Sequence, residues 1–201
     1  MRQKIALTIS FLIIMKVFCQ SLISKDEWVD KLVYLVNQTT IYTKEQGKNL
    51  LDYDGTAWYC DCSGLMKALF NGRNVYSETI GNDVNKTLPV TADLNTDNLI
   101  EKCKDLSTDF SLLKKDEPRL LYFKGHVGAY LGKELKCGEE EENICNVIEC
   151  TSSWNGGIQF SYVDKDGKRY KYKGYKNNEY NWKSMVYQVI GLIIMKKIVK
   201  I

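Results

Sequence analysis

The sequence predicts an α+β fold in which N-terminal helices pack on an antiparallel β-sheet. Apolar residues recur at helical spacing in the part of the chain before Gly72, and short β-type runs follow Pro118. The two patterns do not alternate along the chain, which argues against a parallel α/β fold. At 201 residues with 44% hydrophobic content, the chain can bury one core, so we expect a single folded domain.

Residues 1–21 are predicted to be a secretion signal. A basic start, Met1–Lys4, is followed by an apolar or hydroxyl-bearing run without an acid, and a site for signal peptidase follows at Cys19–Ser21. The apolar run is too short to cross a bilayer, although a buried N-terminal helix would give the same pattern. We therefore expect residues 22–201 to form a secreted domain without stable membrane insertion.

Two helices are predicted before the strands begin. The segment Ser24–Glu27 is a capping-box pattern, and apolar residues recur at helical spacing from there to Val36. A polar stretch over residues 37–55 then leads to a helix that starts at Cys62 and stops at Gly72. In the polar middle of the chain we expect one more helix, over residues 97–106, with loops around it.

The second half of the chain predicts an antiparallel sheet. Runs of β-type residues are separated by turn signals such as Asp166-Gly167. The expected strands cover residues 119–123, 126–131, 146–151, 157–163 and 169–172, and the apolar residues 189–195 are expected to form a final buried strand.

Secretion changes how the cysteines are interpreted, because an oxidising compartment favours disulfides. Six of the seven cysteines follow the signal. Cys137 and Cys145 flank an acidic segment typical of an exposed hairpin tip, so we expect them to be bridged. Cys60 with Cys103 is the second expected pair, and Cys150 is expected to be a small core residue. Spacing alone leaves other connectivities open.

Composition excludes several classes of function. The formal net charge of +3 is too small to indicate nucleic-acid binding, and basic residues are not interleaved with stacking aromatics. With a single histidine the chain lacks the paired spacing of metal ligands, and it has no glycine-rich phosphate loop. We expect no metal, no cofactor, no nucleic-acid partner and a monomeric state.

The strongest indication of chemistry is Cys62, in the segment Asp-Cys-Ser-Gly-Leu, followed by the only histidine, His126. A thiol nucleophile needs a base, and the chain offers one imidazole. A cysteine at a helix N-terminus has its thiolate stabilised, and the same N–H groups can form an oxyanion hole. The alternatives are a disulfide-bonded Cys62 and a purely structural His126.

A third group must orient the imidazole, and Glu149 is the candidate. It is an acid between apolar positions of a predicted strand, where a structural strand rarely places one. Its carboxylate could accept the proton of one ring nitrogen and leave the other nitrogen to serve Cys62. A surface charge on an edge strand is the alternative interpretation.

Three segments together resemble the NlpC family of papain-like cysteine peptidases, which cleave peptide bonds in bacterial peptidoglycan. They are Asp-Cys-Ser-Gly-Leu (61–65), Gly-His-Val-Gly-Ala-Tyr-Leu-Gly (125–132) and Val-Ile-Glu-Cys-Thr (147–151). The resemblance covers residues 28–190 and implies a small papain-like core. It also implies Cys62 as nucleophile, His126 as base and Glu149 as third residue.

The resemblance further implies a tyrosine upstream of the nucleophile at the border of the active site, for which Tyr53 and Tyr59 are both candidates. Trp58 and Trp154 are expected to line the substrate groove, with buried packing as the alternative. Ser63, a small residue directly after the nucleophile, is expected to keep the approach of substrate open.

The expected function is therefore that of a secreted thiol hydrolase that cuts amide bonds in peptidoglycan stem peptides. Both the D-glutamyl bond to a diamino acid and the muramoyl-alanine bond are compatible substrates. An acyltransferase or amidase with the same Cys–His pair is one alternative. A non-enzymatic, disulfide-rich secreted binding domain, with Cys62 bridged, is the other.

Overall fold

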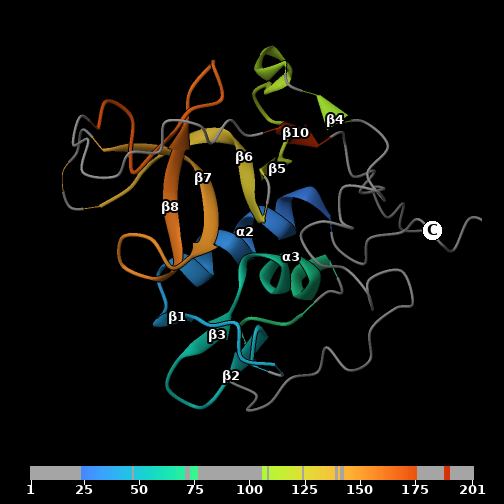
Figure 1. Ribbon diagram of the computed structural model, residues 1–201, viewed down its shortest axis with the longest axis vertical. Helices are drawn as coiled ribbons and strands as arrows, with labels where there is room; N and C mark the ends of the chain where they lie inside the picture. Colours follow the sequence, from blue (N-terminus) through green and yellow to red (C-terminus); the bar gives the residue numbers. More distant parts are fainter. Residues whose placement is uncertain are drawn as a thin grey trace, which may run out of the picture.

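A computed structural model describes most of the chain between residues 24 and 190 (Figure 1). The predicted secretion signal and Cys103 lie outside the described residues. The described ranges are 24–46, 48–70, 73–76, 106–107, 109–123, 125–138, 140, 143–175 and 188–190.

Helix α2 (Lys25–Val36) begins where its capping box predicts. The Ser24 hydroxyl oxygen accepts a hydrogen bond of 3.2 Å from the backbone N–H of Glu27. One face of the helix is buried and is formed mainly by large apolar side chains: Trp28, Val29, Leu32 and Leu35, with Lys31 beside them. The capping pattern and the apolar spacing therefore both describe the observed helix.

Helix α3 (Cys62–Phe70) also starts at its predicted first residue. Its buried side chains include Leu65, Met66, Ala68 and Leu69, all with 0% exposure. Because these residues cover most of the helix surface, α3 is enclosed by the rest of the domain. Cys62 stands at the N-terminus of this buried helix.

A small three-stranded sheet occupies much of the segment that the sequence predicts to be a polar connection. Its strands are β1 (Thr40–Tyr42), β2 (Leu50–Tyr53) and β3 (Trp58–Cys60). Strand β1 pairs with β3 in parallel and β2 pairs with β3 in antiparallel. The prediction of a polar connection is wrong because strands of three or four residues carry too little periodicity to be recognised.

The larger sheet has the order β4-β10-β5-β6-β7-β8-β9, and every neighbouring pair is antiparallel. The structure thus confirms the predicted α+β fold with an antiparallel sheet. Leu106, the expected last residue of the predicted helix over residues 97–106, lies in strand β4 instead, and the other residues of that predicted helix lie outside the described residues. The strands are β4 (Leu106–Ser107), β5 (Arg119–Phe123), β6 (His126–Lys136), β7 (Ile144–Thr151), β8 (Gly157–Val163), β9 (Arg169–Tyr170) and β10 (Gln188–Ile190), and a short 3-10 helix, η2 (Phe110–Leu112), precedes β5.

The predicted hairpin tip between β6 and β7 is closed by the expected Cys137–Cys145 disulfide, with the two Cα atoms 5.9 Å apart. Both strands run further toward the tip than the sequence indicates, and the bridge joins the chain there, beyond their apolar parts.

No helix among the described residues is long and apolar enough to span a bilayer.

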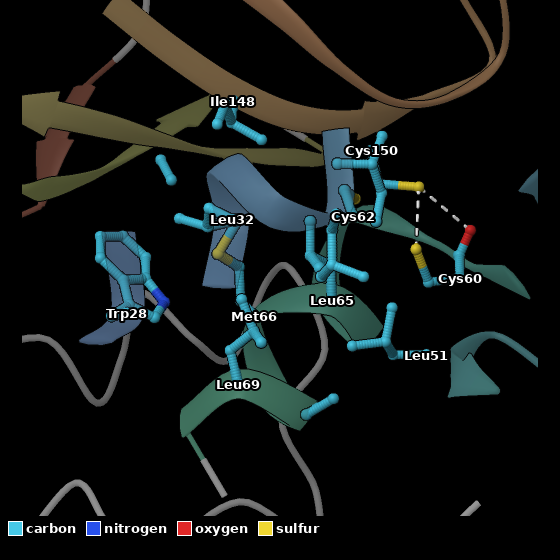
Figure 2. Close-up of a cluster of buried hydrophobic side chains, with 14 of the residues drawn as sticks. Trp28, Leu32, Leu51, Cys60, Cys62, Leu65, Met66, Leu69, Ile148 and Cys150 are labelled. Atoms are coloured by element: carbon cyan, nitrogen blue, oxygen red, sulfur yellow. Dashed lines mark hydrogen bonds between the residues drawn. The ribbon is translucent and has the colours of Figure 1, made fainter. Parts of the chain in front are cut away.

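The main core lies between the two helices and the larger sheet. Helices α2 and α3 contact strands β6 to β8 (Figure 1). Figure 2 shows side chains of both helices gathered with Ile148 and Cys150 of β7. Cys150 is fully buried, as expected. The start of α3 is thereby held against the strand that also carries Glu149.

Gly64 in the first turn of α3 is required by close packing, since an added Cβ would overlap the backbone carbonyl of Asn49. We expect Gly64→Ala to lower the free energy of unfolding by about 1–3 kcal/mol, the usual cost of overpacking. Urea denaturation measures this effect. Ser63→Ala is the matched control in the same turn and should cost about 1 kcal/mol or less. Equal losses for the two variants would contradict the packing argument.

Candidate active site

Asp61 fixes the N-terminus of α3 around Cys62. One carboxylate oxygen accepts hydrogen bonds from the Gly64 N–H at 2.6 Å and from the Ser63 hydroxyl at 2.8 Å. The other oxygen accepts a 2.8 Å hydrogen bond from the side-chain amide of Asn49. These contacts make Asp61 the capping residue of the helix and hold Cys62, which is 5% exposed, in its first turn.

His126 and Glu149 meet through the register of β6 and β7. Gly128 is the direct partner of Glu149, so His126 lies two residues further along the same face, in the diagonal position. Gly128 has no side chain, so it places no atoms between the side chains of His126 and Glu149. The His126 Nε2 and Glu149 Oε2 atoms are 2.6 Å apart, and both residues are buried.

His126 is hydrogen-bonded to Cys62 as well as to Glu149. Burial by itself lowers the pKa of His126, but the hydrogen bonds with Cys62 and Glu149 and the charges of both groups outweigh burial and raise this pKa to about 9. With Nε2 occupied by Glu149, Nδ1 is the ring nitrogen left for the thiol. The structure thus brings together the three residues expected to act in catalysis.

Glu149 is also paired with Arg169, a residue that the sequence analysis does not identify. The Arg169 Nε atom donates to Glu149 Oε1 at 2.7 Å, and the two side chains are 4% and 0% exposed. Burial tends to raise the pKa of Glu149, but the Arg169 charge and the hydrogen bond from His126 hold it well below its usual range. Glu149 therefore stays ionised, and its interpretation as a surface charge on an edge strand is wrong.

Trp154 covers the other side of Arg169. The guanidinium carbon lies 4.3 Å from the centre of the indole ring, a cation–π arrangement. Trp154 is partly exposed and lies in a turn, with a φ of +57°. Its expected contact with substrate stays a prediction, and its observed contact is with the arginine that pairs with Glu149.

Tyr42 on β1 is a second residue near the site that the sequence analysis does not identify. Burial first, and then the charges of Cys62 and Asp61, raise the pKa of Tyr42 to about 12. It therefore keeps its phenolic proton at neutral pH. Its backbone partner in the small sheet is Cys60, two residues before Cys62, which explains why it lies near the nucleophile.

The upstream aromatic residues expected to bind substrate lie in the small sheet. Tyr53 and Trp58 are buried, with ring centres 4.9 Å apart. Tyr59 is partly exposed and its hydroxyl is hydrogen-bonded to Asp54. Tyr53 and Trp58 are thus packed against each other in the protein interior. The roles of all three residues and of Ser63 in substrate binding stay predictions.

The expected Cys60–Cys103 bridge is wrong for this structure. Cys60 is a free thiol, and its sulfur lies 3.2 Å from the sulfur of Cys150. The interpretation failed because Cys60 and Cys150 are distant in sequence and only the fold brings their strands together. Cys62 is hydrogen-bonded to His126 rather than bridged to another cysteine.

Comparison of the chain with family models, curated proteins and solved structures finds no match. The described residues also contain no group of three or more histidine, cysteine, aspartate or glutamate side chains placed to hold a metal ion.

The pKa of His126 can be measured directly, because it is the only histidine in the chain. We expect its imidazole C–H signals to titrate in NMR with a midpoint near pH 9. The folded pKa lies above the ordinary value of 6.5, so protonated His126 stabilises the fold fully below pH 6.5. That contribution, about 3 kcal/mol, is lost as the pH rises through the folded pKa.

Glu149→Gln is the control for this titration, because it removes the carboxylate charge and keeps the shape of the side chain. We expect the midpoint of His126 to move down in this variant. A midpoint at or below 6.5 in the wild-type protein would contradict the raised pKa that the contacts of His126 with Cys62 and Glu149 predict.

Proposed function

We propose that this chain is a secreted, papain-like cysteine hydrolase of the NlpC type that cleaves amide bonds in peptidoglycan stem peptides. Cys62 is the nucleophile, His126 the general base and acid, and Glu149 the residue that orients and stabilises the imidazolium. The observation that carries this proposal is the buried series of contacts from Cys62 through His126 to Glu149.

The order of elements also supports this assignment. A cysteine begins a buried helix, α3, and the histidine and the carboxylate lie on neighbouring antiparallel strands packed against that helix. This is the arrangement that the resemblance to the NlpC family implies. The Cys137–Cys145 disulfide supports secretion, since disulfides persist in oxidising compartments.

The reaction follows from these positions. The imidazolium of His126 and the N-terminus of α3 favour the thiolate of Cys62, which attacks the amide carbonyl carbon. The backbone N–H of Cys62 donates to the oxyanion that develops on the carbonyl oxygen. His126 then gives its proton to the leaving amine, which departs and leaves a thioester on Cys62.

Water completes the cycle. His126, now neutral, takes a proton from the water that attacks the thioester carbonyl, and the carboxylic acid leaves as the Cys62 thiolate is restored. Glu149 stays ionised throughout and stabilises each imidazolium that forms, while Arg169 keeps the Glu149 carboxylate in place.

Digestion of purified muropeptides, followed by mass spectrometry, tests the proposal. We expect products that have gained one water across a single amide bond, and their masses identify whether the D-glutamyl or the muramoyl-alanine bond is cut. Protein alkylated at its thiol with iodoacetamide is the control and should leave the muropeptides intact. Unchanged muropeptides with the unmodified protein would count against this substrate class.

The same digestion separates hydrolysis from acyl transfer. With an added amine such as glycinamide, an acyltransferase would form a product whose mass includes the amine, whereas a hydrolase gives mainly the free acid. A protein that binds muropeptides but forms neither product, with Cys62 resistant to alkylation, would instead be a binding domain.

A further inference from the structure

Two buried thiols lie beside the proposed nucleophile and take no part in the proposed reaction. Cys60 is on β3 and Cys150 is on β7, and both have 0% exposure. Their sulfur atoms are 3.2 Å apart, and the Cys150 thiol also donates to the carbonyl oxygen of Cys60 at 3.2 Å. Figure 2 shows both contacts, with Cys62 next to the pair.

We propose that Cys60 and Cys150 form a second disulfide in the oxidised, secreted protein. A disulfide bond is about 2.05 Å long, so the two sulfur atoms, 3.2 Å apart, need to approach by only about 1.2 Å. The Cys137–Cys145 bridge is of the kind that persists in oxidising compartments, where two thiols in contact are open to oxidation to a disulfide. The proposal does not depend on what Cys62 does.

The pairing would link the two sheets. Strand β3 belongs to the three-stranded sheet, and β7 is an interior strand of the larger one. The two cysteines are 90 residues apart in the sequence, so the bridge would close a long loop and restrict the unfolded chain strongly. It would also fix the residue two places before Cys62 and the residue directly after Glu149.

Oxidation needs an acceptor for two electrons, and a small disulfide such as oxidised glutathione supplies it. One thiolate attacks a sulfur of the oxidant, which releases one glutathione thiolate and leaves a mixed disulfide. The second cysteine, after losing its proton, displaces the other glutathione and forms the Cys60–Cys150 bond. In sum, two protein thiols and one glutathione disulfide become one protein disulfide and two glutathione thiols.

Burial determines when this exchange occurs. Burial and the contact with Cys60 raise the pKa of Cys150 well above its ordinary value, so the folded, reduced pair contains little thiolate. We therefore expect the bridge to form during oxidative folding, when the strands first meet, and to form slowly if oxidant is added after folding.

Peptide mapping of the non-reduced protein tests the proposal, using full-length chain secreted from a eukaryotic host and alkylated during denaturation. Cleavage before aspartate separates Cys60, in peptide 54–60, from Cys62, in the next peptide, which begins at Asp61. Cleavage after glutamate separates Cys150, in peptide 150–163, from Cys145. We expect peptides 54–60 and 150–163 to be disulfide-linked and Cys62 to carry the alkyl group.

Three other results would overturn the proposal: alkylated Cys60 and Cys150 in protein whose Cys137–Cys145 bridge is intact, a bridge from either residue to Cys62, or a bridge from Cys60 to Cys103.

Thermal unfolding gives a second measurement. Reductant should lower the unfolding midpoint more in the wild-type protein than in Cys150→Ala, which retains only the hairpin bridge. Equal shifts would contradict the second disulfide, and both readouts are independent of muropeptide cleavage.

Discussion

Replacing Cys62 by alanine is expected to abolish muropeptide hydrolysis, with turnover falling by about 10⁴-fold or more. The thiol is the group that attacks the carbonyl, and the substitution removes only one heavy atom, its sulfur, from the core. Turnover measured by mass spectrometry, together with a thermal unfolding curve, separates loss of chemistry from loss of folding. The double variant Cys137→Ala/Cys145→Ala is the control, because it removes two cysteines from a remote hairpin tip.

His126→Ala should be as inactive as Cys62→Ala, because the two residues act as one unit. For the same reason, the double variant Cys62→Ala/His126→Ala should be no worse than either single change. If the fold loss in turnover of the double variant equals the product of the two single losses, the two residues act independently. A fully active Cys62→Ala protein would end the thiol-hydrolase proposal.

Removing the carboxylate of Glu149 is expected to have the largest effect on stability. Glu149→Ala leaves the buried Arg169 guanidinium without its counter-charge, and losing one partner of such a pair costs about 3–5 kcal/mol. Glu149→Gln, which can still hydrogen-bond, should lose less stability and retain some turnover. Urea denaturation measures the first effect and muropeptide turnover the second.

Glu134 supplies the matched control for this experiment. Its ion pair with Lys173 has a similar length, 2.8 Å, but both side chains are about half exposed. Glu134→Ala should therefore change the free energy of unfolding by about 1 kcal/mol or less. If Glu149→Ala does not fold, Arg169→Met gives a second measurement. A Glu149 carboxylate that Arg169 no longer holds in place should then shift the NMR midpoint of His126, and an unchanged midpoint would remove Arg169 from its positioning role.

The helices and the long strands could be predicted because their signals are local. The capping residues before α2 and the position of Cys62 at the start of α3 depend on a few adjacent residues. Glu149 could be recognised because an acid between apolar strand residues needs an unusual environment. The structure provides that environment as a buried pair with His126 on the neighbouring strand.

The features that escaped prediction depend on contacts between distant parts of the chain. Arg169 begins a strand that the sequence predicts, but nothing in the neighbouring residues connects it with Glu149. It reaches Glu149 because β7, β8 and β9 lie side by side. Tyr42 lies in β1, and a strand of only three residues is too short to be recognised from the sequence. The partner of Cys60 could not be chosen either, because six cysteines allow many pairings and only the meeting of β3 with β7 selects Cys150.

The distance along the chain between Glu149 and Arg169 has a consequence for biosynthesis. The arginine is made 20 residues after the glutamate, which takes about 1–4 s at the usual rate of translation. During that interval His126 is present on β6 but the guanidinium is not, so enclosing β7 with Glu149 ionised is less favourable than in the complete domain. The hairpin of β6 and β7 is therefore fully stabilised only after β9 has emerged, and completion of the catalytic centre is coupled to the arrival of a residue outside the three that would perform the chemistry.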